Sequence, residues 1–320
     1  MKYSFTRATG IEISKISLGT LIIKNKKSTL KLFDKAFSQG VNYFDTSDGY
    51  QGGTSEIVLG EFIRNQKREN ILIGSKAYFP RSENILEKGL TKKNIFHSVE
   101  KSLINLNTDY LDIFYCHRFD NNTPIEETLD AIESLIRQGK ILSWGVCGFS
   151  VFQLCKMYFR AREKLISRPS VAQYAYNLFN RSIEIDMSEA LKELNVDVLS
   201  YYPLAQGVLT AKYSNGIPKD SRAIRTEFKK NMWDLTLSNI EKAKKLSDLA
   251  SKLNTTSIAL AINWCLFNEN IKSVITSASS IEQLNQILAF EQFELTEEIK
   301  KEIEFIFDNH PVNQYTGIKY

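Results

Sequence analysis

Eight short apolar segments, each followed by a stretch with helical spacing, limit the fold of this chain more than any other feature. Strands of a parallel sheet are buried on both faces, so they need not alternate between apolar and polar residues. The expected strands are residues 16–21, 42–46, 71–75, 110–116, 141–147, 171–176, 196–202 and 271–276. Eight alternating strand and helix units predict an α/β fold, a closed (β/α)8 barrel of the TIM type.

Helices are expected between these strands and after the last one. They cover residues 29–39, 55–65, 92–105, 150–163, 188–194, 238–253, 257–268, 281–289 and 296–307, with one more beginning near Pro124. Residues 3–18 predict an N-terminal β-hairpin around Thr9 and Gly10, and the last two helices form a C-terminal extension. An open doubly wound sheet is the alternative, but no G-x-G-x-x-G sequence follows the first strand, which counts against it.

The helix near Pro124 has the clearest start signal in the sequence. Thr123 precedes Pro124 and stands three residues before Glu126, which predicts a threonine cap and a capping box. The longest irregular connection, residues 206–236, is expected to cover the active face of the barrel rather than to separate two domains. We therefore expect one domain over residues 1–320.

Composition excludes several classes of function. The 320 residues include 41 basic and 37 acidic ones, giving a net charge of +4, and no run of like charge indicates a nucleic-acid surface. The longest apolar run, residues 258–267, is too short to span a membrane. The four cysteines lack CxxC or zinc spacing, so we expect no metal site and reduced thiols. With no apolar signal-peptide core at the start of the chain, a cytoplasmic protein is the expectation.

Residues able to carry acid–base chemistry stand where several strands end. Asp45 closes the second strand and Tyr50 follows in the next turn, while Lys76, His117 and Gln173 stand at the ends of later strands. The active site of such a barrel lies at the C-terminal ends of its strands. Each residue alone has an ordinary structural explanation, such as a turn former or a solvated lysine. Their agreement on one reaction favours a catalytic site.

This set of residues suits the reduction of a carbonyl group. Hydride addition leaves negative charge on oxygen, and we expect Tyr50 to donate the proton. A free tyrosine has a pKa of about 10, and Lys76 is expected to bring the pKa of Tyr50 toward neutrality. Asp45 should keep Lys76 charged and in place, and His117 should hydrogen-bond the substrate oxygen.

Long motifs around these residues resemble the aldo-keto reductase family over nearly the whole chain. They are Phe44–Tyr50, Ile73–Lys76, Thr108–His117 and Tyr202–Lys212. Residues 217–223 and 278–284 are most similar to the branch that includes the β subunits of voltage-gated potassium channels and related bacterial enzymes. The resemblance implies NADPH bound across the barrel mouth without a Rossmann fold, a small-molecule carbonyl substrate, and catalysis by Asp45, Tyr50, Lys76 and His117.

The same resemblance implies which residues contact the cofactor. Thr20 and Asp45 would lie beside the nicotinamide ribose, Gln173 would bind the carboxamide, and Tyr201 would stack on the ring. The phosphates would follow Leu204, Gly207, Lys212 and Arg222, and the adenosine would contact Ser277, Ser279, Gln283 and Gln286. Free backbone N–H groups at the helix that begins near Ser280 also favour phosphate. Ser280 and Gln283 can equally form a capping box, and both roles are compatible.

The chain departs from the family pattern at several cofactor positions. Cys147 and Gly148 stand where the family has serine and asparagine, which removes one expected carboxamide contact. Tyr202 replaces a serine, Thr276 and Ser277 replace a proline–glycine pair, and Ile287 replaces an asparagine that reads adenine. The catalytic positions are unaffected, so we expect weaker cofactor affinity with intact chemistry.

Three functions fit this sequence. The first is an NADPH-dependent reductase of aldehydes or ketones, and the second is an NADPH-binding regulatory subunit like the channel β subunits. The third is a reductase of a keto or enone sugar in a biosynthetic pathway. His117 favours an enzyme, because the channel subunits have asparagine at this position. The substrate is not specified by the sequence, and a homo-oligomer is left open.

Overall fold

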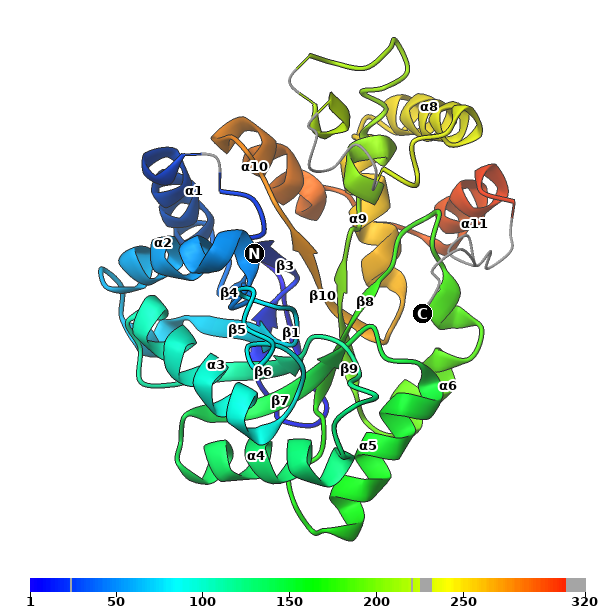
Figure 1. Ribbon diagram of the computed structural model, residues 1–320. Coiled ribbons are helices and arrows are strands. Elements are labelled where there is room, and N and C mark those ends of the chain that lie inside the picture. Colours follow the sequence, from blue (N-terminus) through cyan, green and yellow to red (C-terminus); the bar gives the residue numbers. More distant parts are fainter. Residues whose placement is uncertain (24, 220, 225–231, 309–320) are drawn as a thin grey trace.

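Eight parallel strands form a closed barrel in the computed structural model, which describes residues 1–23, 25–219, 221–224 and 232–308, with only the backbone of Arg222. Neighbouring strands pair in the order β10-β3-β4-β5-β6-β7-β8-β9 (Figure 1). They are β3 (Ile16–Gly19), β4 (Tyr43–Asp45), β5 (Leu72–Ala77), β6 (Leu111–Cys116), β7 (Ile141–Cys147), β8 (Val171–Ala175), β9 (Asp197–Tyr201) and β10 (Ile271–Thr276). The predicted (β/α)8 barrel is confirmed.

Helices surround the strands on the outside of the barrel (Figure 1). They are α1 (Lys26–Ser38), α2 (Thr54–Ile63), α3 (Lys92–Leu106), α4 (Ile125–Arg137), α5 (Val151–Glu163), α6 (Met187–Glu193), α8 (Leu237–Lys252), α9 (Ser257–Phe267), α10 (Ile281–Leu288) and α11 (Glu297–Ile306). The strands β1 (Tyr3–Phe5) and β2 (Glu12–Ser14) pair antiparallel, as expected for the hairpin. The predicted helices at the C-terminus correspond to α10 and α11.

The interior of the barrel is filled by alternate residues of the strands, because successive side chains point to opposite faces. These inward residues, together with Ile13 of the hairpin strand β2, form an apolar cluster whose other members are Tyr43, Ile113, Tyr115, Val171, Leu199 and Ile275. Gly74 contributes no side chain to it, since a Cβ there would lie 1.9 Å from the hydroxyl of Tyr43. Asp45, Lys76, His117 and Gln173 each stand two residues after an inward position of the same segment. The same alternation therefore turns them inward as well, above the cluster. The barrel therefore presents these four residues at one level, toward the C-terminal side of its strands.

The expected capping box at Thr123 is wrong. Helix α4 begins at Ile125 with Pro124 in the cap position, and no side chain caps it. The Thr123 hydroxyl donates instead to Asp120 Oδ2 at 2.7 Å. Asp120 also accepts from the backbone N–H groups of Leu90 and Asn122, so its carboxylate organises the whole turn. The hydrogen bond to the charged Asp120 carboxylate is stronger than one between the hydroxyl and a neutral helix N–H, so it fixes the Thr123 side chain in the turn.

Candidate active site

A buried ion pair forms the base of the site. Lys76 Nζ lies 2.6 Å from Asp45 Oδ2 and donates to the carbonyl oxygen of Thr46 at the same distance. The other carboxylate oxygen of Asp45 accepts from Gln173 Nε2 at 2.6 Å. Lys76 and Asp45 are 2% and 4% exposed, so water screens this pair very little. Both charges are held in one geometry by several hydrogen bonds.

Gln173 reaches this pair from the middle of β8 and not from its end. Its main chain pairs with Cys147, the last residue of β7, and β8 continues for two residues beyond that level. Lys76 is likewise followed by Ala77 within β5. The level of the site is therefore set by the register between strands, which the sequence alone does not give.

Tyr50 is carried over the barrel by a tight reversal of the chain. It opens the short helix η1 (Tyr50–Gly53), and the three residues after it have positive φ: 49° at Gln51, 65° at Gly52 and 93° at Gly53. Glycine adopts this region without steric cost, which lets α2 begin at once. The centroid of the Tyr50 ring lies 5.9 Å from that of His117 and 5.1 Å from Lys76 Nζ.

The expectation that Lys76 brings the pKa of Tyr50 toward neutrality is not met in this structure. The pKa of Tyr50 is raised well above its ordinary value, with burial as the largest cause and the negative charge of Asp45 next. The cation that opposes this rise is Arg118. Lys76 is neutralised by Asp45 at 2.6 Å, so its field at the phenol is weak. Tyr50 is therefore protonated at neutral pH, the form that donates a proton.

His117 follows β6 and is 8% exposed. Burial is the first cause that lowers its pKa well below the ordinary value, followed by the charges of Lys76 and Arg118. The imidazole is consequently neutral near pH 7. Its Nδ1 lies 3.4 Å from Ser47 Oγ, and the ring of Phe79 packs edge-on against it at 4.8 Å. A neutral imidazole fixed on two sides can hydrogen-bond a carbonyl oxygen without adding charge.

A cavity of about 730 Å³ opens above these residues. The predicted site residues that line it are Asp45, Tyr50, His117, Cys147, Gln173, Tyr201, Leu204, Gly207, Lys212, Ser277, Ser279, Gln283 and Gln286. Lys76 is buried and does not line the cavity. Thr20 is buried and does not line the cavity, although Gly19 and Leu21 on either side reach it. The side chain of Arg222 lies outside the described residues.

Sequence reasoning missed two groups of lining residues. Arg118 lines the cavity directly after His117. Its position next to the predicted catalytic residue His117 is a signal for Arg118, but a prediction based on strand ends alone does not include this arginine. The second group consists of hydroxyl-bearing residues from the end of α8 to the start of α9, namely Ser247, Ser251, Thr255, Thr256 and Ser257. Nothing in the sequence indicates that this helix junction folds over the barrel mouth.

The cavity has the features of a site for a long polar ligand with phosphate groups. Three buried oxygen atoms of its lining, Gln206 Oε1, Ser221 Oγ and Thr276 Oγ1, have no hydrogen-bond partner among the described residues. The N-termini of α9 and α10 both open toward it, at Thr256–Ser257 and near Ser279. Helix N-termini present backbone N–H groups that favour anions. These features fit a dinucleotide.

The start of α10 departs in detail from the expected capping box. Ser280 caps the helix by accepting from the backbone N–H of Gln283. Gln283 Oε1, however, accepts from both the N–H and the hydroxyl of Ser279, each at 2.9 Å, and not from Ser280. The amide therefore turns its oxygen inward and leaves its Nε2 N–H groups without a partner among the described residues. They remain free to donate to a ligand.

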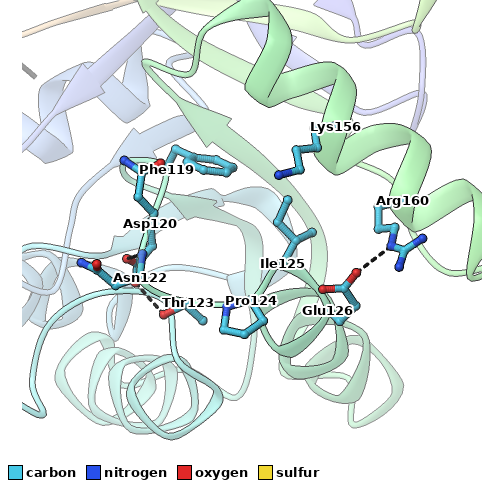
Figure 2. Close-up of a pocket in the computed structure, with 10 residues that line it drawn as sticks. Phe119, Asp120, Asn122, Thr123, Pro124, Ile125, Glu126, Lys156 and Arg160 are labelled. Atoms are coloured by element: carbon cyan, nitrogen blue, oxygen red, sulfur yellow. Dashed lines mark hydrogen bonds and ion pairs between the residues drawn. The ribbon is translucent and has the colours of Figure 1, made fainter.

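A second cavity of about 460 Å³ lies between the segment after β6 and helix α5 (Figure 2). Three of its charged groups already have partners: Arg160 Nε donates to Glu126 Oε1 at 2.6 Å, and Asp120 accepts three hydrogen bonds. No residue of the predicted site lines it. The larger cavity is therefore the candidate active site.

Searches for other kinds of site add little within the described part of the chain. There, no group of three or more His, Cys, Asp or Glu side chains is arranged to hold a metal ion. In the same residues, no helix has the length and apolar character needed to cross a membrane.

The family comparison agrees with the fold. The model of the aldo/keto reductase family matches residues 15–307, nearly the whole chain. This match does not distinguish branches, so the closer likeness to the channel β subunits stays a prediction. Family and barrel together support an oxidoreductase. The chain belongs to the aldo/keto reductase family.

Proposed function

We propose that this protein reduces an aldehyde or ketone to the alcohol with NADPH, using Tyr50 as the proton donor. The observation that carries this proposal is the meeting of Tyr50, His117 and the Lys76–Asp45 pair at one end of a large polar cavity. Reduced nicotinamide, when bound, supplies the hydride. The remaining chemistry is proton supply and charge stabilisation, for which these side chains are suited.

The lining divides by chemistry into the parts that a dinucleotide needs. Asp45, Cys147, Gln173 and Tyr201, with Thr20 nearby, would hold the nicotinamide end. Leu204, Gly207 and Lys212, with Arg222, would meet the diphosphate, and Ser277, Ser279, Gln283 and Gln286 the adenosine. Gly207 has φ of 93°, and a Cβ there would lie 2.8 Å from Lys212 Nζ. The backbone and the ammonium group therefore approach each other closely at the proposed phosphate position.

Each catalytic side chain has a distinct task in this proposal. The substrate carbonyl oxygen accepts hydrogen bonds from Tyr50 and from neutral His117, which sets its orientation. As negative charge develops on that oxygen, the phenolic proton of Tyr50 transfers to it. The phenolate that remains lies beside the ion pair, with Lys76 Nζ 5.1 Å from the ring centroid. Asp45 keeps Lys76 oriented, so the ion pair acts through Tyr50.

Tyr50→Phe tests this assignment, because it removes the hydroxyl and keeps the ring. We expect kcat for an activated aromatic aldehyde to fall by at least the ~10²–10⁴ typical of one acid–base group. The dissociation constant for NADPH, followed by fluorescence, should change little. A Tyr50→Phe protein as active as the wild type would refute the assignment of the proton donor.

We further propose that the protein acts in the cytoplasm on a small-molecule substrate. All four cysteines are free, and Cys116, Cys147 and Cys265 are buried, which is compatible with a reducing compartment.

A further inference from the structure

We infer that the substrate carries a carboxylate close to its carbonyl group and that Arg118 binds this carboxylate. This inference rests on the proposed function and adds a substrate class to it. Arg118 follows His117 directly and lines the same cavity. It is one of two residues among the described lining that carry a permanent positive charge, the other being Lys212.

One nitrogen of the Arg118 guanidinium is anchored to the protein. Nη1 donates to the carbonyl oxygen of His117 at 2.7 Å, and lies 3.4 Å from the carbonyl oxygen and 3.3 Å from the Sγ of Cys147. The glycine at position 148 makes room for it, because a Cβ there would lie 3.0 Å from Nη1. The guanidinium is therefore held in a fixed orientation over the end of β7.

The opposite edge of the guanidinium is unengaged. Nε and Nη2 have no hydrogen-bond partner, and Arg118 has no carboxylate within ion-pair distance, among the described residues. Elsewhere in this chain, the partly buried arginines Arg7, Arg68, Arg81 and Arg181 each pair with an Asp or Glu. The Nε and Nη2 N–H groups form the edge that matches a carboxylate bidentately. A positive charge without a counter-ion in an active-site cavity favours an anionic ligand.

The position of Arg118 relative to the reacting groups limits where that carboxylate can be. The ring of Phe79 packs against His117 at 4.8 Å and lies 5.6 Å from Arg118 Cζ, so one aromatic wall borders both side chains. Tyr50 is also close enough for the charge of Arg118 to lower its pKa. A substrate whose carbonyl oxygen meets Tyr50 and His117 would thus place a nearby carboxylate at the free edge of Arg118.

The test compares two aldehydes of almost equal size, 4-formylbenzoate and its methyl ester. The readout is the ratio of kcat/KM for the acid to that for the ester, in which any general loss of activity cancels. In Arg118→Gln this ratio should fall about 10- to 100-fold, the range expected for losing one charged hydrogen-bonded pair. Arg118→Lys should give an intermediate ratio, since it keeps charge but not the bidentate edge. Arg160→Gln, in the cavity of Figure 2, is the matched control and should leave the ratio unchanged.

A second variant and a wild-type measurement guard against misfolding. Gly148→Asn keeps the arginine but crowds Nη1, and asparagine tolerates the left-handed backbone at this position, so the ratio should also fall. In the wild type, benzoate should inhibit more strongly than benzamide, and the difference should shrink as salt is raised. Equal inhibition by both, or a ratio unaltered in Arg118→Gln, overturns the inference. If neither aldehyde is reduced by the wild type, the proposed function fails instead.

Discussion

The Lys76–Asp45 pair couples stability and activity within two side chains. Removing one partner of a buried pair leaves the other charge without compensation, which costs about 3–5 kcal/mol. We expect Lys76→Met to lose roughly this much unfolding free energy and to lose activity by more than ~10². The double variant Lys76→Met/Asp45→Asn should recover much of the stability, because the lone carboxylate is gone, but none of the activity. Urea unfolding and steady-state rates measure the two properties separately. Recovery of both together would mean that the pair is only structural.

The pKa shifts of Tyr50 and His117 predict the pH dependence. The pKa of Tyr50 is raised, so its acid form persists throughout the neutral range, and the pKa of His117 is lowered, so it stays neutral there. Reduction should therefore be nearly independent of pH between about 6.5 and 9, the ordinary pKa of histidine and a value below that of tyrosine. Alcohol oxidation needs the phenolate, so its kcat/KM should rise about tenfold per pH unit over the same range. A plateau below pH 9 would show that the pKa of Tyr50 is lowered when the enzyme works.

At the scale of single residues, sequence reasoning identified side chains better than their electrostatics. The polar strand ends led to Asp45, Lys76, His117 and Gln173, which the barrel brings together. The pKa of Tyr50 could not be predicted, because it depends on burial and on how fully Asp45 neutralises Lys76. Arg118 was missed because its importance follows from the missing side chain at Gly148 and from the lack of a paired carboxylate among the described residues, neither of which a strand-end pattern reveals.

Among the elements, the connection after β5 is fastened to the catalytic turn by Arg81. Arg81 Nη1 donates to Asp48 Oδ2 at 2.8 Å, and its Nη2 donates to Asn94 Oδ1 of α3 at 2.8 Å. Asp48 stands two residues before Tyr50, and its pair with Arg81 is almost fully buried, with side chains 2% and 3% exposed. One arginine thus joins the turn that carries Tyr50, the connection that carries Phe79, and helix α3.

Arg81→Met should therefore disturb the placing of Tyr50 without touching substrate or cofactor. We expect lower kcat for reduction, NADPH affinity close to that of the wild type, and a loss of unfolding free energy of about 3–5 kcal/mol. Arg137→Met is the control, because the Arg137 side chain is 74% exposed and surface ion pairs such as its pair with Glu133 contribute about 0–1 kcal/mol. If Arg81→Met lowers stability but leaves kcat unchanged, the Arg81–Asp48 pair does not position Tyr50 and is only structural.

The order and type of the elements were predictable, whereas the side-chain hydrogen bonds at their ends were not. Hydrophobic spacing and glycine stops mark each strand and helix closely enough to recover all eight barrel strands. The start of α4 was misassigned because Asp120, three residues before Thr123, competes for its hydroxyl. Such competition depends on the folded turn, in which Leu90 from another connection also donates to Asp120.

Over the whole molecule, the two ends of the barrel have different roles. At the end opposite the cavity, Arg7 from the hairpin bonds the fully buried Asp197 at the start of β9, with Nε 2.7 Å from Oδ1. Arg7 also donates to Asn270 at 3.0 Å, next to β10. The hairpin thus stabilises the barrel at the N-terminal ends of its strands, while the segments after β9 and β10 line the cavity at the C-terminal ends. This separation is common in barrels of this kind.

The cavity as a whole predicts that NADPH binds more tightly than NADH, by a modest factor. At the proposed adenosine end the described lining offers neutral donors, the two N–H groups of Gln283 Nε2, because Gln283 Oε1 is held by Ser279. Neutral hydrogen bonds contribute about 1 kcal/mol each, so two of them give a preference on the order of tenfold to a few tens. Ser279→Ala should reduce this ratio, because it removes the hydroxyl that orients the Gln283 amide. Lys212→Met should weaken both cofactors alike if Lys212 meets the shared diphosphate. Fluorescence titration with both cofactors at low and high salt gives the dissociation constants needed for each protein. Tighter binding of NADH by the wild type would contradict the assignment of Ser279 and Gln283 to the 2′-phosphate.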